Sequence, residues 1–211
     1  MGQPPDTQFQ TNTTVWLTKA GVPPNSLYYP PSNLAVGGLS LNTISFNENI
    51  WVNGTDTSIT YQDTTYINYK PINYQPPFIW VVGGNSYFQG FSFTNTNDFP
   101  QYTGYTLLPD TVDLYKGVYI PLKSYKGVDR IEVFLHGGGG NGGMMETQTK
   151  AITPAHSGVY FSGDDLLSPM LGTSWGEIFI AFYRDNYQTI NGRVYNFRTG
   201  LIFIKSVYVK Q

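Results

Sequence analysis

The sequence has no cysteine and is poor in charged residues. Without cysteine, it can form neither a disulfide framework nor a thiolate metal site. Only 12% of its 211 residues are charged, and the formal net charge is −2. Such a balance offers no broad positive surface to nucleic acid, so no nucleic-acid partner is predicted.

Long apolar runs are also missing. Ile178–Tyr183 is among the longest, far short of the roughly 20 apolar residues that cross a bilayer. Met1–Asp6 has neither the basic region nor the apolar region of a secretory signal. We therefore expect no membrane span and no secretory signal.

Residues that favour helices are sparse, whereas Thr, Tyr, Val, Ile and Phe are common. This composition suits strands, and turn residues separate about eleven short strand-like segments at roughly ten-residue spacing. The sequence therefore predicts an all-β protein, an antiparallel β-sandwich with little helix. The predicted strands are 13–18, 39–46, 49–53, 57–62, 78–82, 87–93, 111–122, 128–135, 158–161, 177–184, 193–197 and 201–209.

The chain organisation follows from its proline-bearing stretches. Residues 1–12 are polar and are predicted to form a flexible arm, followed by one jelly-roll-like domain at 13–211. Proline-rich crossings at 22–31 and 70–77 favour jelly-roll (Greek-key) wiring over a meander. A subdivision near Pro109-Asp110 stays open. Short helical turns are possible at 144–151 and 164–171.

Two motifs are similar to those of serine hydrolases. His136 is followed by Gly137-Gly138-Gly139, as in an oxyanion loop, and Gly172-Thr173-Ser174-Trp175-Gly176 fits the Gly-x-Ser-x-Gly nucleophile elbow. An elbow leaves a strand and enters a helix, but a strand is predicted after Ser174 and none before it. His136 and His156 both precede Ser174, against the chain order of that family. The glycines at 137–143 are better explained as a mobile loop, or as a place where a neighbouring subunit approaches closely.

Metal and cofactor signals are weak. Two histidines twenty residues apart, without cysteine, do not make a zinc site. Asp164-Asp165 lacks the spacing of a calcium loop and is better explained as a solvated turn. We predict no catalytic residue, no metal and no cofactor. Glycan acceptor sequons occur at Asn12 and Asn53, where chance matches are expected.

Aromatic residues make up 16% of the chain and are the remaining functional lead. Tyrosine on a polar strand stacks on sugar rings and is enriched in protein interfaces, although it often only stabilises the sheet. The candidate platforms are Tyr61, Tyr66, Tyr69, Tyr74, Tyr87, Tyr102 and Tyr105, together with Trp16, Trp51, Trp80 and Trp175.

The whole pattern resembles jelly-roll coat and vertex proteins, penton or turret components, of icosahedral viruses of archaea and bacteria. The shared features are the polar arm Met1–Asn12, the long inter-strand loops, the scarcity of helix and the apolar strand Leu201–Val209. The resemblance implies a non-enzymatic virion subunit, assembled in the host cytoplasm, that contacts copies of itself and other virion proteins, with a host-surface glycan as a further candidate partner. The alternatives are a carbohydrate- or receptor-binding β-sandwich and, third, a hydrolase using Ser174.

Overall fold

A computed structural model describes residues 7–17, 38–42, 44–53, 56–63, 76–86, 89–138, 144–147 and 149–211. Strands predominate, and the described residues contain one α-helix, α1 (Gly163–Met170), and one 3-10 turn at Gly104–Leu107. The predicted all-β class is confirmed. The strands are β1 (Thr7–Leu17), β2 (Leu39–Leu41), β3 (Ile44–Asn53), β4 (Asp56–Asp63), β5 (Phe78–Val82), β6 (Phe91–Asn95), β7 (Gln101–Tyr102), β8 (Thr111–Asp113), β9 (Val118–Pro121), β10 (Tyr125–Lys126), β11 (Arg130–Gly138), β12 (Met144–Glu146), β13 (Lys150–Ile152), β14 (Gly158–Phe161), β15 (Trp175–Arg184), β16 (Tyr187–Ile190) and β17 (Arg193–Lys210).

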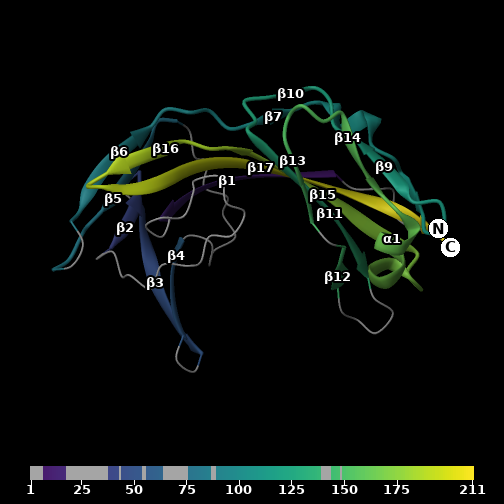
Figure 1. Ribbon diagram of the computed structural model, residues 1–211, viewed down its shortest axis with the longest axis horizontal. Coiled ribbons are helices and arrows are strands. Elements are labelled where there is room, and N and C mark those ends of the chain that lie inside the picture. Colours follow the sequence, from purple (N-terminus) through teal and green to yellow (C-terminus); the bar gives the residue numbers. More distant parts are fainter. Residues whose placement is uncertain are drawn as a thin grey trace. The chain divides into compact units, whose positions relative to one another are not determined.

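The largest sheet is built around β17, the long yellow strand of Figure 1. Its main order is β1-β17-β15-β11-β12, while β13 also pairs with β11, and β8 and β16 also pair with β17. The pairs β17–β15 and β15–β11 are antiparallel, and β8 runs parallel to β17. A second sheet has the order β4-β3-β2-β5-β6, and β9–β14 and β7–β10 form two-stranded sheets.

The chain forms two compact units that are discontinuous in sequence. Unit 1 contains the described residues within 1–13, 99–185 and 199–211, and unit 2 contains those within 14–98 and 186–198. Strand β17 contributes to both units. Two units that share a strand do not decide between one domain and two, and the single domain at 13–211 stays a prediction.

Unit 1 has a two-layer apolar core. Alternate residues of β11, β15 and β17 point inward, because successive side chains of a strand lie on opposite faces. They meet buried side chains of β8, β9, β14 and α1 in one cluster. The inward residues of the large sheet include Val112, Ile131, Val133, Leu135, Ile178, Ile180, Phe182, Leu201, Phe203 and Val207, and those of the second layer include Val118, Ile120, Val159, Phe161, Leu166 and Met170.

A charged residue, Lys205, also lies on the inward face of β17. It is only 8% exposed, and its Nζ donates to the carbonyl of Leu108 at 2.8 Å and pairs with Asp110 at 2.6 Å. These partners replace the water that the ammonium group loses on burial. Lys205 therefore fixes the segment before β8 against the large sheet.

Unit 2 has an aromatic core of its own. Phe78, Trp80 and Val82 of β5 are buried. Phe197 on the first part of β17 stacks on Phe93 of β6, with ring centroids 4.1 Å apart, and also contacts Trp80. The two strands at this point are further held by Asn95, whose Nδ2 donates to the Phe197 carbonyl at 3.3 Å.

Several predicted strands are confirmed, and others end at different residues. The hairpin around Gly54 corresponds to β3 and β4, in which Asn53 pairs with Asp56. The predicted strand 39–46 is wrong as a single strand, because Asn42 has a positive φ of 47° and turns the chain from β2 into β3. Asparagine tolerates this conformation, and its side chain accepts a bond from the Ile79 amide at 2.7 Å.

Strand 111–122 is likewise interrupted, because the Asp113 carboxylate accepts bonds from the amides of Tyr115 and Lys116 and forms a turn. Conversely, 193–197 and 201–209 are one continuous strand. Gly200 does not break it, since it pairs with Tyr183 of β15. The predicted strand 87–93 is shifted to 91–95.

The short helix predicted at 164–171 is confirmed as α1, whereas 144–151 carries β12 and β13 instead of a helix. Pairing with β11 decides this, because it supplies strand partners that overrule local preference. Strand β1 begins at Thr7, six residues before the predicted start, and so includes residues 7–12 of the predicted arm. Its neighbour β17 accounts for this extension of a polar segment. Among the described residues, no helix is long and apolar enough to cross a membrane.

Candidate functional site

One glycine of each hydrolase-like motif lies opposite the other on two neighbouring strands. Gly137 of β11 pairs with Gly176 of β15. A Cβ on Gly137 would collide with the carbonyl oxygen of Pro169, and one on Gly176 would lie 2.7 Å from Cε of Met170. Both positions therefore receive the C-terminal end of α1. The interpretation of Gly137 as part of a mobile loop is wrong, and the close approach there comes from the chain's own helix.

The elements on either side of Ser174 are in the opposite order to those of a nucleophile elbow. Helix α1 precedes it and β15 follows it, whereas an elbow leads from a strand into a helix. Ser174 is exposed, and its carbonyl accepts the amide of Val209 at 3.0 Å. The motif here connects a helix to a strand and anchors that connection to β17.

The two aspartates proposed as a solvated turn instead begin a helix. Asp165 completes a capping box with Ser162, whose amide donates to Oδ2 of Asp165 at 2.8 Å. Lys150 Nζ reaches the same oxygen at 2.8 Å. The hydrogen bond from Lys150 and that from the Ser162 amide lower the pKa of the Asp165 carboxyl. Asp165 thus joins β13 to α1, and the part of the chain that the structure describes contains no cluster of three metal-ligating side chains.

The most extensive feature of unit 1 is the second, outward face of β11, β15 and β17. Its residues alternate with the core residues and lie in cross-strand rows. Most are half-buried, and Trp175 and Tyr208, which pair with each other, are 46% and 42% exposed. We call this the outer face; it comprises Arg130, Glu132, Phe134, His136, Trp175, Glu177, Phe179, Ala181, Tyr183, Ile202, Ile204, Ser206 and Tyr208.

The centre of the outer face is apolar and ordered. Phe134 and Phe179 are register partners, and their rings stack with centroids 4.9 Å apart and planes 8° apart. Ile204 pairs with Phe179 in the same row. His136 packs on the Phe179 ring at 4.3 Å, and its Nδ1 lies 3.9 Å from a carboxylate oxygen of Glu177.

Charged groups border that centre at both ends. Arg130 pairs with Glu132 at 3.2 Å and lies over the Tyr183 ring at 5.0 Å. The His136–Glu177 pair stands at the other end. An apolar aromatic centre with a polar border is the anatomy of a protein interface.

The predicted aromatic platforms differ in exposure. Tyr102 and Trp80 are buried, and burial raises the pKa of the Tyr102 phenol. Tyr105 is 40% exposed but packs against Phe203 of the core, whereas Trp175 is exposed on the outer face. Four candidates lie outside the described residues: Tyr66, Tyr69, Tyr74 and Tyr87. For three more, the structure describes the strand but not the side chain: Trp16, Trp51 and Tyr61.

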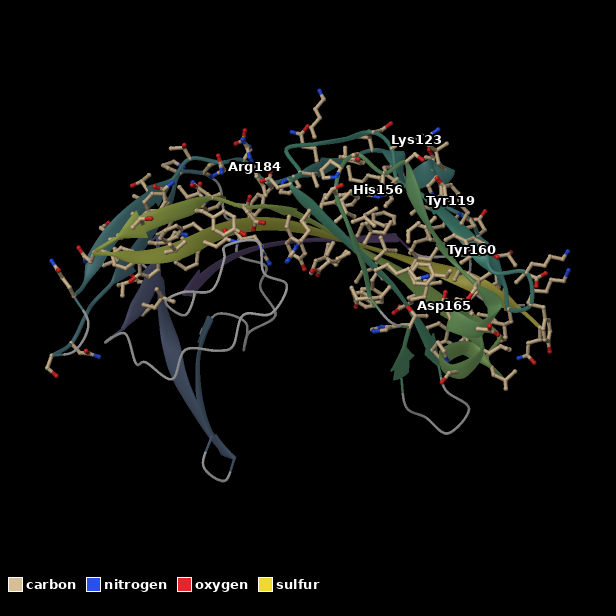
Figure 2. All side chains as sticks on the ribbon, in the orientation of Figure 1. Tyr119, Lys123, His156, Tyr160, Asp165 and Arg184 are labelled. Atoms are coloured by element: carbon tan, nitrogen blue, oxygen red, sulfur yellow. The ribbon has the colours of Figure 1, made fainter. Side chains whose placement is uncertain are left out.

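Sequence reasoning missed one pair of exposed tyrosines. Tyr119 of β9 and Tyr160 of β14 are register partners, 49% and 52% exposed (Figure 2). Each ends a Gly-Val-Tyr tripeptide, at 117–119 and 158–160. The repetition of this tripeptide is the signal from which the pair could have been found.

No protein-family model matches the chain, and neither the curated proteins nor the solved structures contain a significant match to its sequence or fold.

Proposed function

We propose that this protein is a non-enzymatic structural subunit of a virus particle, a coat or vertex component that acts by self-association. The observation that carries the proposal is the outer face. Its first partner is a second copy of the chain, and other virion proteins are further partners. Assembly takes place in the host cytoplasm.

The character of the outer face supports association with a protein. Phe134, Phe179 and Ile204 form an apolar centre on strands whose opposite side already fills the core of unit 1. A soluble sheet commonly has one apolar and one polar side, whereas interface centres are aromatic and depleted in charge.

The charges at its borders support a symmetric partner. Arg130 and Glu132 lie at one end of the strands, and His136 and Glu177 at the other. In a two-fold pairing, the same patch is used by both copies, and where the axis runs perpendicular to the strands, one end of a strand meets the other end of its partner strand. Arg130 of one copy then approaches Glu177 of the next.

The sheet connections support jelly-roll wiring, which we include in the proposal. The chain leaves β14 in one layer, passes through α1 and enters β15 in the other. The neighbours β17, β15 and β11 are not successive strands, so each connection passes through other elements. Such crossings between layers are typical of Greek-key sandwiches.

The test is the molar mass by light scattering across a concentration series, for the wild type and two variants. We expect a closed oligomer for the wild type and a shift towards 23.6 kDa for Ile204→Lys, because a charge then lies in the interface centre. Val81→Lys is the matched control, an exposed apolar residue of β5 in unit 2. A wild type that is monomeric at every concentration, or Ile204→Lys that associates unchanged, overturns the proposal.

A further inference from the structure

We propose that Tyr119 and Tyr160 form a binding platform for carbohydrate, with their outward ring faces stacked on successive pyranose rings. The platform lies on the β9–β14 pair, which covers the core of unit 1 on the side away from the large sheet. It is distinct from the outer face.

The phenol end of each tyrosine lies against a glycine across the strand pair, Gly117 directly before β9 for Tyr160 and Gly158 of β14 for Tyr119. A Cβ on Gly117 would lie 2.8 Å from Cζ of Tyr160, and one on Gly158 would lie 2.5 Å from Cζ of Tyr119. The two contacts are diagonal neighbours across an antiparallel pair, and the two Gly-Val-Tyr tripeptides are thus related by a local two-fold. Only glycine leaves room for a ring to lie so low on the sheet.

The phenol groups hold the rings in this position. The hydroxyl of Tyr160 donates to the carbonyl of Lys116 at 2.6 Å, and that of Tyr119 forms a hydrogen bond with Oγ of Ser157 at 3.3 Å. With the phenol end of each ring against a glycine and the hydroxyl engaged, each ring is held on the sheet, and about half of each side chain stays exposed to a ligand. A ring fixed before binding loses little conformational entropy on binding.

The size of the platform favours a small ligand over a protein. Two half-exposed tyrosines offer roughly 150–250 Å², whereas a stable protein interface takes about 800 Å² from each partner. A pyranose has a flat side of C–H groups that meets the electron-rich face of an aromatic ring, and hydroxyl groups around its edge.

Polar residues next to the two glycines offer partners for such hydroxyls. Lys116 precedes one glycine, and His156 and Ser157 precede the other, all three exposed. The amide of Leu122 donates to the Ser157 carbonyl at 2.9 Å, which holds the segment of His156 and Ser157 next to β9. Tyrosine is the suitable residue type because it combines an apolar ring with a polar end.

The test uses the full chain on a printed glycan array, followed by titration of the best soluble tetrasaccharide and its monosaccharide. We expect the tetrasaccharide to bind more tightly, because two rings then stack. Tyr119→Leu and Tyr160→Leu keep an apolar cover over the glycine but remove the flat ring, and each should weaken binding on the order of tenfold. Tyr119→Phe keeps the ring and should retain most of the affinity.

Tyr187→Leu, at an exposed tyrosine of β16 in unit 2, is the matched control and should bind as the wild type does. Thermal unfolding of each leucine variant shows that it is folded. The absence of any bound glycan, or an affinity unchanged in both folded leucine variants, overturns the platform. The molar-mass experiment is separate, so this proposal and self-association fail independently.

Discussion

The two faces of the β11–β15–β17 sheet are made by the same strands and nevertheless differ in what they contact. On the inward face, Val133, Ile180 and Phe203 are fully buried against a second layer. On the outer face, the neighbouring residues Phe134, Phe179 and Ile204 are also apolar but only half-buried.

This difference shows which apolar surface is already buried within the chain and which is still partly in contact with water. Burial of apolar surface contributes about 25 cal/mol per Å², and the inward face has gained it almost completely. On the outer face, part of the apolar surface is still in contact with water, so the corresponding free energy has not been gained. The comparison therefore separates stability, which the inward face provides, from the association that we propose for the outer face.

The largest effect is expected at Phe203. Phe203→Ala removes a fully buried ring that contacts Tyr102 at 5.4 Å, and we expect a loss of about 3–5 kcal/mol in the free energy of unfolding. Urea denaturation followed by tryptophan fluorescence measures it. A loss below 1 kcal/mol would show that the two faces do not differ as described.

The next largest loss in the free energy of unfolding is expected for Gly137→Ala, because the added methyl group meets the carbonyl of Pro169 and displaces α1 from the sheet. Overpacking of this kind costs about 1–3 kcal/mol. Ser174→Ala, in the connection after α1, is the matched control and should stay within about 0.5 kcal/mol, since Ser174 is exposed. Equal losses in both variants would contradict the packing role assigned to Gly137.

How far the sequence alone could lead is seen in these same strands. The alternation at 128–135 correctly predicts β11, and the apolar residues at 201–204 indicate a strand with two apolar faces. Alternation cannot say which face meets the second layer, because that depends on β9, β14 and α1, which pack there through tertiary contacts. It also cannot show that Gly200 lies inside a strand, since pairing with Tyr183 decides this.

The candidate sites show the same limit. The hydrolase-like motifs are short matches in a glycine-rich chain, and one glycine of each, Gly137 and Gly176, leaves room for the packing of α1. The platform tyrosines were missed because Tyr119 and Tyr160 lie 41 positions apart, and only strand pairing brings them together. A repeated tripeptide is visible in a sequence, but the pairing of the two strands that carry it is not.

A smaller effect is expected where α1 begins and contacts β13. Asp165→Asn weakens the capping box and the pair with Lys150, and we expect a loss of about 1 kcal/mol. The pKa of Asp165 is lowered in the folded state, so its contribution is fully present above the unfolded value of 3.8 and is lost as the pH falls through the folded pKa. Denaturation at pH 7 and pH 3 should therefore show the wild type and Asp165→Asn converging at the lower pH. A constant difference between them would contradict the assignment.

The smallest effect comes from a matched pair of substitutions that tests the two faces directly. Ile180→Val, on the inward face, should cost about 1 kcal/mol at any protein concentration, because a buried methyl group is lost. Ile204→Val, on the outer face, should cost less than about half as much in the monomer, since part of that surface is still in water.

The two costs should approach each other as the concentration rises and copies associate. Association buries the outer face, and a partner that binds only the folded chain adds its binding free energy to stability. Thermal unfolding of both variants at low and high protein concentration measures the change. A difference that stays constant with concentration would mean that Ile204 is not in the interface, even where the protein is oligomeric.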